Sequence, residues 1–214
     1  MKQLFFITIA LLFASVACKK DETSDPVPVK SSVLDYMPLQ VGNYWIYETF
    51  RCDSGEVNCT SKSIDTSRII KDTLINDKKY FKLIGNYHLF VDPLYIRDSG
   101  DYLVDHNGKV LFTHTDSLQI FNENVVTGLG DDTVFYYYDK LISQNIQVSV
   151  EAGIFDCMDM RTSLFRALDD FQIEHQGHNY YAKNVGLIKQ SVFWAIGLDV
   201  YKRELIGYHL EAGK

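Results

Sequence analysis

Apolar and polar side chains alternate every second residue along much of this chain, and helical spacing of apolar positions is nearly absent. The clearest case lies in 141–150, where Ile142, Ile146, Val148 and Val150 would share one face and polar residues the other. Such a segment is typical of a strand with one buried and one solvated face. The pattern therefore predicts a mainly β protein.

Turn signals separate the alternating segments at short intervals. Asn107-Gly108 is the clearest, because this pair tolerates the positive φ angles of a two-residue type I′ hairpin loop. Such a loop would pair Val104 with Leu111 across the hairpin. Short spacing of this kind favours hairpins and meanders over crossovers through helices.

The pattern predicts about 10–12 antiparallel strands in a single domain. We expect strands at 43–52, 59–72, 79–89, 93–98, 101–106, 109–114, 133–139, 141–150, 155–164, 171–183, 187–194 and 199–210, and a short helix or a loop at 116–125. A dozen strands do not stay one flat sheet. We therefore expect a strongly curled sheet, a half-barrel or barrel, or two layers.

The first 17 residues carry the features of a secretory signal. Lys2 supplies a positive charge, and Leu4 to Ala17 is an uncharged apolar run. This run is shorter than the roughly 20 residues that a membrane-spanning helix needs. Ala17 precedes Cys18 in a stretch that resembles a bacterial lipobox, although Ser15 stands where Leu is usual. We predict that 1–17 is a lipoprotein signal peptide and that Cys18 becomes the acylated N-terminus.

The residues after Cys18 suggest where the protein goes. Lys19, Lys20, Asp21 and Glu22 resemble the surface-export signal of Bacteroidetes lipoproteins. The alternative is that they are only the start of a solvated tether. Residues 18–33 contain prolines and serines without apolar periodicity, so we expect a flexible tether there. The β-rich domain is then expected over 34–214.

Composition and charge exclude some functions. The formal net charge is −7 and no basic patch stands out, so we do not expect nucleic-acid binding. With 14 Tyr and 13 Phe, the chain suits sheets with one wet face. Cys52 and Cys59 enclose a polar hairpin tip, and export favours a disulfide between them over two unpaired thiols. Cys157 is expected to be a small core residue.

Three stretches together resemble a known group of proteins. They are 36–47 (YMPLQVGNYWIY), 151–157 (EAGIFDC) and 181–189 (YAKNVGLIK). In this order they are similar to a family of uncharacterised Bacteroidetes lipoproteins, with Asn184 where such proteins more often carry Gly. The resemblance implies no reaction and no catalytic residues. The glycines and aromatic residues of these stretches also have a purely structural interpretation as turns and packing.

Candidate catalytic and metal-binding residues are few. His175 and His178 are the best metal candidates, but in a strand they would point to opposite faces. Asp131-Asp132 and Asp169-Asp170 lack the spacing of a calcium loop. A hydrolase would have to gather residues such as His175, His178 and Asp169 in one cleft. We therefore expect no metal, no cofactor and no enzymatic activity.

The most promising binding residues lie in the run 135–138 (FYYY). In a strand Tyr136 and Tyr138 share one face, while Phe135 and Tyr137 share the other. One pair should pack in the core, and Tyr136 and Tyr138 could form a wet surface that stacks on sugars or apolar ligands.

These observations predict a lipoprotein of the outer membrane, anchored by its lipid and exposed on the cell surface. Its expected role is a binding module for a glycan, a peptide or a protein partner. The alternative is a carrier or chaperone of a lipid or other apolar ligand, which would need an apolar cavity of several hundred Å³.

Overall fold

A computed structural model describes residues 31–85, 93–115, 119–193 and 199–212, which belong to one compact unit. The expected signal peptide, Cys18 and the export residues 19–22 lie outside the described residues. Part of the expected strand 79–89 also lies outside them.

The described residues form twelve strands and two short 3-10 helices. The helices are η1 (Val33–Asp35) and η2 (Ala167–Asp169). The strands are β1 (Tyr44–Cys52), β2 (Cys59–Ile75), β3 (Lys78–Ile84), β4 (Leu94–Ser99), β5 (Tyr102–Asp105), β6 (Val110–Thr113), β7 (Ile120–Thr127), β8 (Thr133–Val150), β9 (Gly153–Arg166), β10 (Glu174–Ala182), β11 (Gly186–Phe193) and β12 (Val200–His209).

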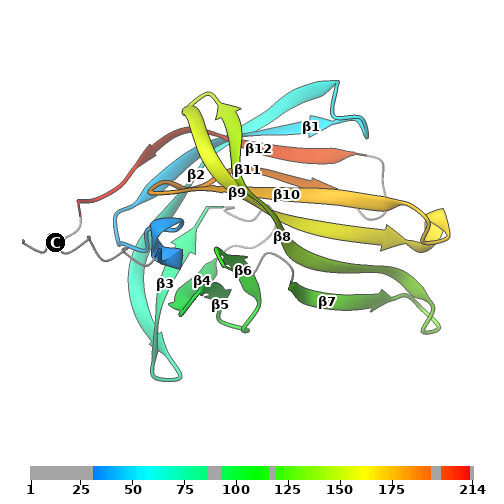
Figure 1. Cartoon of the computed structure of the whole chain (residues 1–214), viewed down its shortest axis with the longest axis horizontal. Coiled ribbons are helices and arrows are strands. Elements are labelled where there is room, and N and C mark those ends of the chain that lie inside the picture. The colour runs from blue at the N-terminus through cyan, green and yellow to red at the C-terminus, as the bar shows by residue number, and fades with distance from the viewer. Residues whose placement is uncertain (1–30, 86–92, 116–118, 194–198, 213–214) are drawn as a thin grey trace, which may run out of the picture. The chain divides into compact units, whose positions relative to one another are not determined.

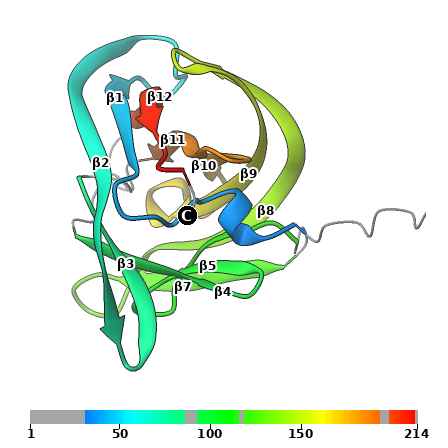
Figure 2. The same ribbon diagram turned by 90° about the vertical axis from the view of Figure 1, so that its left-hand side faces the viewer.

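All twelve strands belong to one antiparallel sheet in the order β6-β5-β4-β3-β2-β1-β12-β11-β10-β9-β8-β7. β1 and β12, the first and last of the described strands, therefore pair at the centre of the sheet. The sheet curls strongly: in Figure 2 β2 rises on one side, β8 and β9 on the other, and β3, β4, β5 and β7 lie below (Figures 1 and 2). The predicted fold class, a single antiparallel domain with a barrel-like sheet, is confirmed.

A side chain closes the seam between the two ends of the sheet. The Asn122 amide of β7 accepts a hydrogen bond from the Val110 N–H (3.1 Å) and donates one to the Val110 carbonyl (2.6 Å) of β6. It also donates to the Asp139 carboxylate of β8 at 2.6 Å. Asn122 can reach β6 because it lies at a bulge, with a φ of 54°. The hydrogen bonds of one side-chain amide thus connect β6 and β7 in place of backbone hydrogen bonds between two paired strands.

Large side chains fill the interior of the curled sheet. Those with less than 2 % exposure include Trp45, Arg203, Tyr47, Tyr181, Phe112 and Met37. The helix η1 lies at one end, where its capping box from Ser32 fixes the turn that delivers Val33 and Met37 to the core. Burial of such apolar area is the main source of stability in a domain of this size.

The three stretches that resemble Bacteroidetes lipoproteins meet in this core. The Trp45 indole N–H donates to the Val185 carbonyl at 2.7 Å, joining the first stretch to the third. Gly186 follows with a φ of 114°, and a Cβ there would come within 3.2 Å of the Trp45 Nε1. The middle stretch joins the third, where Cys157 pairs with Ala182 between β9 and β10. Packing and turn geometry account for these residues.

Two of the expectations about secondary structure were wrong. Residues 120–127 form the strand β7, where a short helix or a loop was expected. The two strands expected at 133–139 and 141–150 are one continuous strand, β8. The expected break fell between Asp139 and Leu141. Asp139 is in fact only 7 % exposed, and its carboxylate accepts hydrogen bonds from Thr162 and Asn122.

The loop at Asn107-Gly108 also differs from the prediction. The Asp105 N–H bonds to the Lys109 carbonyl, which leaves three residues in the loop, and only Gly108 has a positive φ. This is a turn followed by a bulge rather than a type I′ turn. Val104 consequently pairs with Val110, not with Leu111.

Candidate binding surfaces

The predicted tyrosines lie on a stack of aromatic rings. Tyr136 and Tyr138 share one face of β8, and both stack on Phe165 of β9, with ring centroids 4.8 Å and 6.4 Å apart. Phe171 also stacks on Tyr136, with ring centroids 5.8 Å apart. All four rings are half-buried. We call these four residues the aromatic face.

Backbone pairing explains the stack. Tyr136 lies opposite Phe165 and Tyr138 opposite Ser163 in the β8–β9 ladder. Directly opposite side chains lie within contact distance on one face of a sheet. Phe171 comes from the turn after η2, where Asp170 and Phe171 both adopt left-handed φ angles and return the chain over β8.

Charged and polar groups border the aromatic face. Ser163 donates a hydrogen bond to Glu174 at 2.5 Å, and Arg161 lies 3.4 Å from the same carboxylate. Among the described residues, the Arg161 Nε is buried without a hydrogen-bond acceptor. Gln176 is exposed and lies opposite Ser163 on β10. The rings thus adjoin a guanidinium, a carboxylate and an amide.

The other half of the aromatic run did not behave as predicted. Phe135 and Tyr137 point to the opposite face of β8, but both are half-buried and neither belongs to the main core. The Lys109 ammonium lies 6.0 Å from the Tyr137 ring, and the Asn124 amide lies 3.4 Å from its hydroxyl. The expectation that one of the two pairs packs in the core was therefore wrong.

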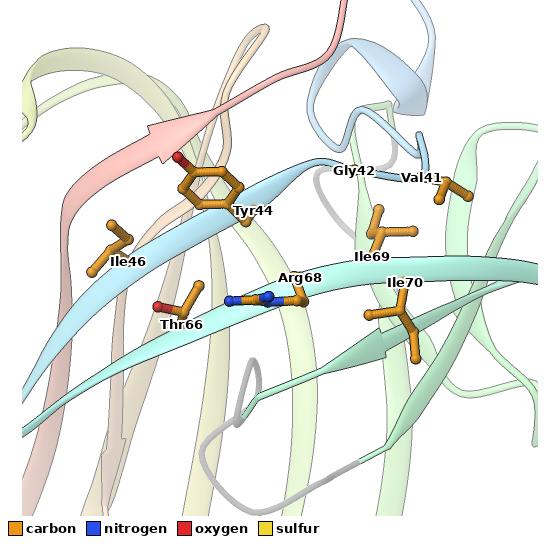
Figure 3. A pocket seen from close by; sticks show the side chains of 8 residues that line it. All are labelled: Val41, Gly42, Tyr44, Ile46, Thr66, Arg68, Ile69 and Ile70. Atoms are coloured by element: carbon orange, nitrogen blue, oxygen red, sulfur yellow. The ribbon is translucent and has the colours of Figure 1, made fainter.

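A second surface is a groove over the outer faces of β1 and β2 (Figure 3). It has a volume of about 510 Å³, and we call it the β1–β2 groove. Its lining residues are Val41, Gly42, Tyr44, Ile46, Thr66, Arg68, Ile69 and Ile70. All but Gly42, Thr66 and Arg68 have large apolar or aromatic side chains.

The sheet pairing forms this groove. Tyr44 lies opposite Arg68 and Ile46 opposite Thr66, so these four side chains share one face. On the other side of β1, Gly207 of β12 lies opposite Ile46. Because glycine has no side chain, it leaves that side of the Ile46 side chain uncovered. The pairing of β2 with β3 shifts by one residue between Ile69 and Lys71, so Ile70, which lines the groove, lies at a bulge.

The interior carries a polar cluster beside the apolar core. Arg203 is fully buried, lies 4.0 Å from the centre of the Tyr47 ring and donates hydrogen bonds to Ser67 (3.0 Å) and Asp65. Gln190 lies opposite Arg203 and donates to the Asn179 amide at 2.6 Å. Hydrogen bonds within this cluster offset part of the cost of burying its polar groups.

The two candidate histidines are separated. β10 runs through both without a bulge, so they face opposite sides of the sheet. His175 contacts Asp169 at 2.6 Å, and His178 contacts Asp159 at 2.9 Å. Hydrogen bonds from Arg166 and then from His175 hold the pKa of Asp169 below its usual value. The Asp169 carboxylate is thus paired with both Arg166 and His175.

The structure forms a disulfide between Cys52 and Cys59, which lie opposite each other at the end of the β1–β2 hairpin. Cys157 is a buried free thiol, 1 % exposed. Burial and then the charges of Asp156 and Asp159 raise the pKa of Cys157 to about 12. A thiol with such a pKa is a poor nucleophile.

Within the described residues, no three His, Cys, Asp or Glu side chains gather as a metal site. Asp131 and Asp132 lie on the exposed turn between β7 and β8. No helix among the described residues has the length and apolar character to cross a bilayer.

Sequence reasoning missed several residues of these surfaces. Phe165, Phe171 and Arg68 were not singled out, because their partners come from other strands or from a turn. The one available signal for Phe165 was its place directly after the strand expected at 155–164.

Comparisons with known proteins returned two solved structures. One, from Bacteroides fragilis NCTC 9343, is described as a candidate exported protein with a YmcC-like fold; the two chains are 10% identical, the match covers 80% of this chain and 97% of that chain, and the TM-score is 0.38. The other is a candidate lipoprotein from Parabacteroides distasonis ATCC 8503, with 11% identity, coverage of 81% and 98%, and a TM-score of 0.40. No family model and no curated protein matches. Likeness at this level does not bear on function.

Proposed function

We propose that this chain is a lipid-anchored protein of the outer membrane, exposed on the cell surface, whose folded unit binds a glycan through the aromatic face without catalysing a reaction. The observation that carries the proposal is the stack of Tyr136, Tyr138, Phe165 and Phe171 on one half-exposed face. The lipobox-like stretch and the charged residues after Cys18 support the location.

The chemistry of the aromatic face suits sugars. The C–H faces of a sugar ring pack on an aromatic ring, while its hydroxyls need donors and acceptors at the rim. Glu174, Arg161 and Gln176 border the rings and supply such groups. The rings are already stacked on one another, so little side-chain freedom is lost when a ligand binds.

The alternative of a lipid carrier places its ligand inside the curled sheet. Large buried side chains, among them Trp45, Tyr47 and Arg203, fill the described interior. This argues for binding on the outside of the sheet. A peptide or protein partner would use the same aromatic face, and it is an outcome of the test below.

The first test screens the chain from residue 18 onward, with Cys18→Ser to prevent acylation, against immobilised polysaccharides of neutral and acidic composition. A bound glycan should lose about thirtyfold in affinity in the Tyr136→Ala, Tyr138→Ala double variant, since each ring contributes about 1 kcal/mol. Tyr137→Ala is the matched control, because that ring lies on the opposite face of β8.

Equal loss of binding in the Tyr137→Ala control would show that the variants act by unfolding, so all variants are checked by thermal melting. Binding that survives the double variant refutes the aromatic face as the site. If the chain instead retains a protein, and the double variant does not retain it, the ligand is a protein and the aromatic face is still the binding site.

A second test addresses location. Intact cells are treated with protease, in parallel with a variant in which Lys20, Asp21 and Glu22 are all changed to Ala. Cleavage of the wild type with protection of the variant supports export to the surface. Protection of both would place the protein inside the envelope and favour a periplasmic carrier.

A further inference from the structure

We propose that the β1–β2 groove is a second ligand site, separate from the aromatic face, and that its ligand is a single acyl chain ending in a carboxylate: a free fatty acid. The lining of the groove is apolar along β1, and it includes the guanidinium of Arg68, for which the described residues provide no ion-pair partner (Figure 3).

The apolar part of the groove is accessible to a ligand. Its volume of about 510 Å³ falls in the range of small-molecule sites. Val41 and Ile70 both line the groove and are 43 % and 40 % exposed, so each presents apolar surface to solvent. Contiguous exposed apolar surface of this kind marks binding sites on soluble domains. An acyl chain laid along Ile46 would cover it.

Arg68 supplies the charge complementarity. Among the described residues it forms no ion pair with any carboxylate, in contrast to Arg51, Arg161, Arg166 and Arg203. It lies between Thr66 and Ile70 in the groove wall (Figure 3). A guanidinium binds a carboxylate with two parallel hydrogen bonds.

Among the described residues that line the groove, Arg68 carries the positive charge, so it is the head-group site of this proposal. The Tyr44 ring, opposite Arg68, stacks on His209 with centroids 5.3 Å apart. Glu211 lies 3.5 Å from His209 and adjoins the lining residue Gly42. Glu48 lies two residues after Ile46, on the same face of β1. A single positive group fits a singly charged head such as a carboxylate.

The test uses a fluorescent fatty acid, 11-(dansylamino)undecanoate, with the chain from residue 18 onward carrying Cys18→Ser. Competitors of equal chain length are dodecanoate, 1-dodecanol and dodecylammonium, all below the concentration at which micelles form. We expect dodecanoate to displace the probe about tenfold better than dodecanol, from the charge-assisted hydrogen bonds to Arg68. Dodecylammonium should compete least.

Two variants locate the site. Arg68→Gln should weaken dodecanoate about tenfold and bring it to the level of dodecanol. Ile70→Asp should abolish binding of all acyl competitors, because it places a charge in the apolar wall. Lys62→Gln is the matched control: it removes an exposed positive charge from the same strand, outside the groove.

The proposal is overturned if the probe does not bind, if dodecanoate and dodecanol compete equally, or if Arg68→Gln and Lys62→Gln behave alike. Binding that persists in Ile70→Asp overturns it as well. The Tyr136→Ala, Tyr138→Ala variant should bind the probe normally. The fatty-acid site and the glycan site can therefore fail independently.

Discussion

Asn122 should contribute more to stability than a partly exposed asparagine normally does. Its amide makes three hydrogen bonds, two to Val110 across the seam and one to the buried Asp139 carboxylate. A neutral hydrogen bond contributes about 1 kcal/mol and one to a charged group about 2 kcal/mol. Water can replace part of the two seam bonds, so loss of the Asn122 amide should cost about 3 kcal/mol.

The left-handed backbone at Asn122 adds a second, separable contribution. With a φ of 54°, an alanine is strained by about 1 kcal/mol and a glycine is not. Asn122→Gly should therefore be less destabilising than Asn122→Ala, although both lose the amide. The matched control is Asn124→Ala on the same strand, whose amide makes only one long, exposed contact. It should change stability by less than about 0.5 kcal/mol.

Urea unfolding measures these differences. With a slope of about 2 kcal/mol/M, a loss of 3 kcal/mol lowers the midpoint by about 1.5 M. Hydrogen exchange at the Val110 amide is the local measurement, because its N–H donates to Asn122. That amide should lose protection in both Asn122 variants. An unchanged midpoint together with an unchanged Val110 exchange rate would refute the role of Asn122 in closing the sheet.

Three further predictions concern cysteines and glycines. Changing Cys52 and Cys59 together to Ser should lower the unfolding free energy by about 2–3 kcal/mol, as expected for a short closed loop, and denaturant titration would show it. Cys157 should resist iodoacetamide at pH 8 until the chain is unfolded, because its pKa is about 12; rapid labelling of the native protein would contradict its burial. Gly186→Ala should cost clearly more than Gly100→Ala in thermal melts, since both have positive φ but only the first meets a buried indole.

The general architecture was predictable from local signals. Alternation, turn residues and the number of strands indicated a curled antiparallel sheet. In the structure, Ile146, Val148 and Val150 are buried or half-buried, and the polar residues between them are exposed. These features depend on neighbours in the sequence, which is why they could be seen without the structure.

Bulges account for what could not be predicted. β7 was missed because its bulge at Asn122 interrupts the alternation of a polar segment. In β8 two register shifts between Leu141 and Ile146 add two residues to this strand. Counting outward from the β8–β9 turn would therefore have paired Tyr138, not Tyr136, with Phe165. An extra residue in a strand leaves little trace in the sequence.

The candidate site was predictable only in part. Tyr136 and Tyr138 could be placed on one face from their spacing alone. Their stacking partner Phe165 depends on the shifted register, and Phe171 depends on two consecutive left-handed residues after η2. The β1–β2 groove depends on Gly207 standing opposite Ile46 from the far end of the chain. Long-range pairings of this kind are not encoded in local patterns.

The most direct test of the proposed function is to map a glycan from the binding screen onto the protein by NMR. Amide and aromatic signals are followed during titration of the isotopically labelled chain from residue 18 onward with Cys18→Ser. Our account predicts that the shifted signals cluster at Tyr136, Tyr138, Phe165 and Phe171. Signals that shift only around Arg68, or no shifts with any glycan that the screen retains, would contradict it.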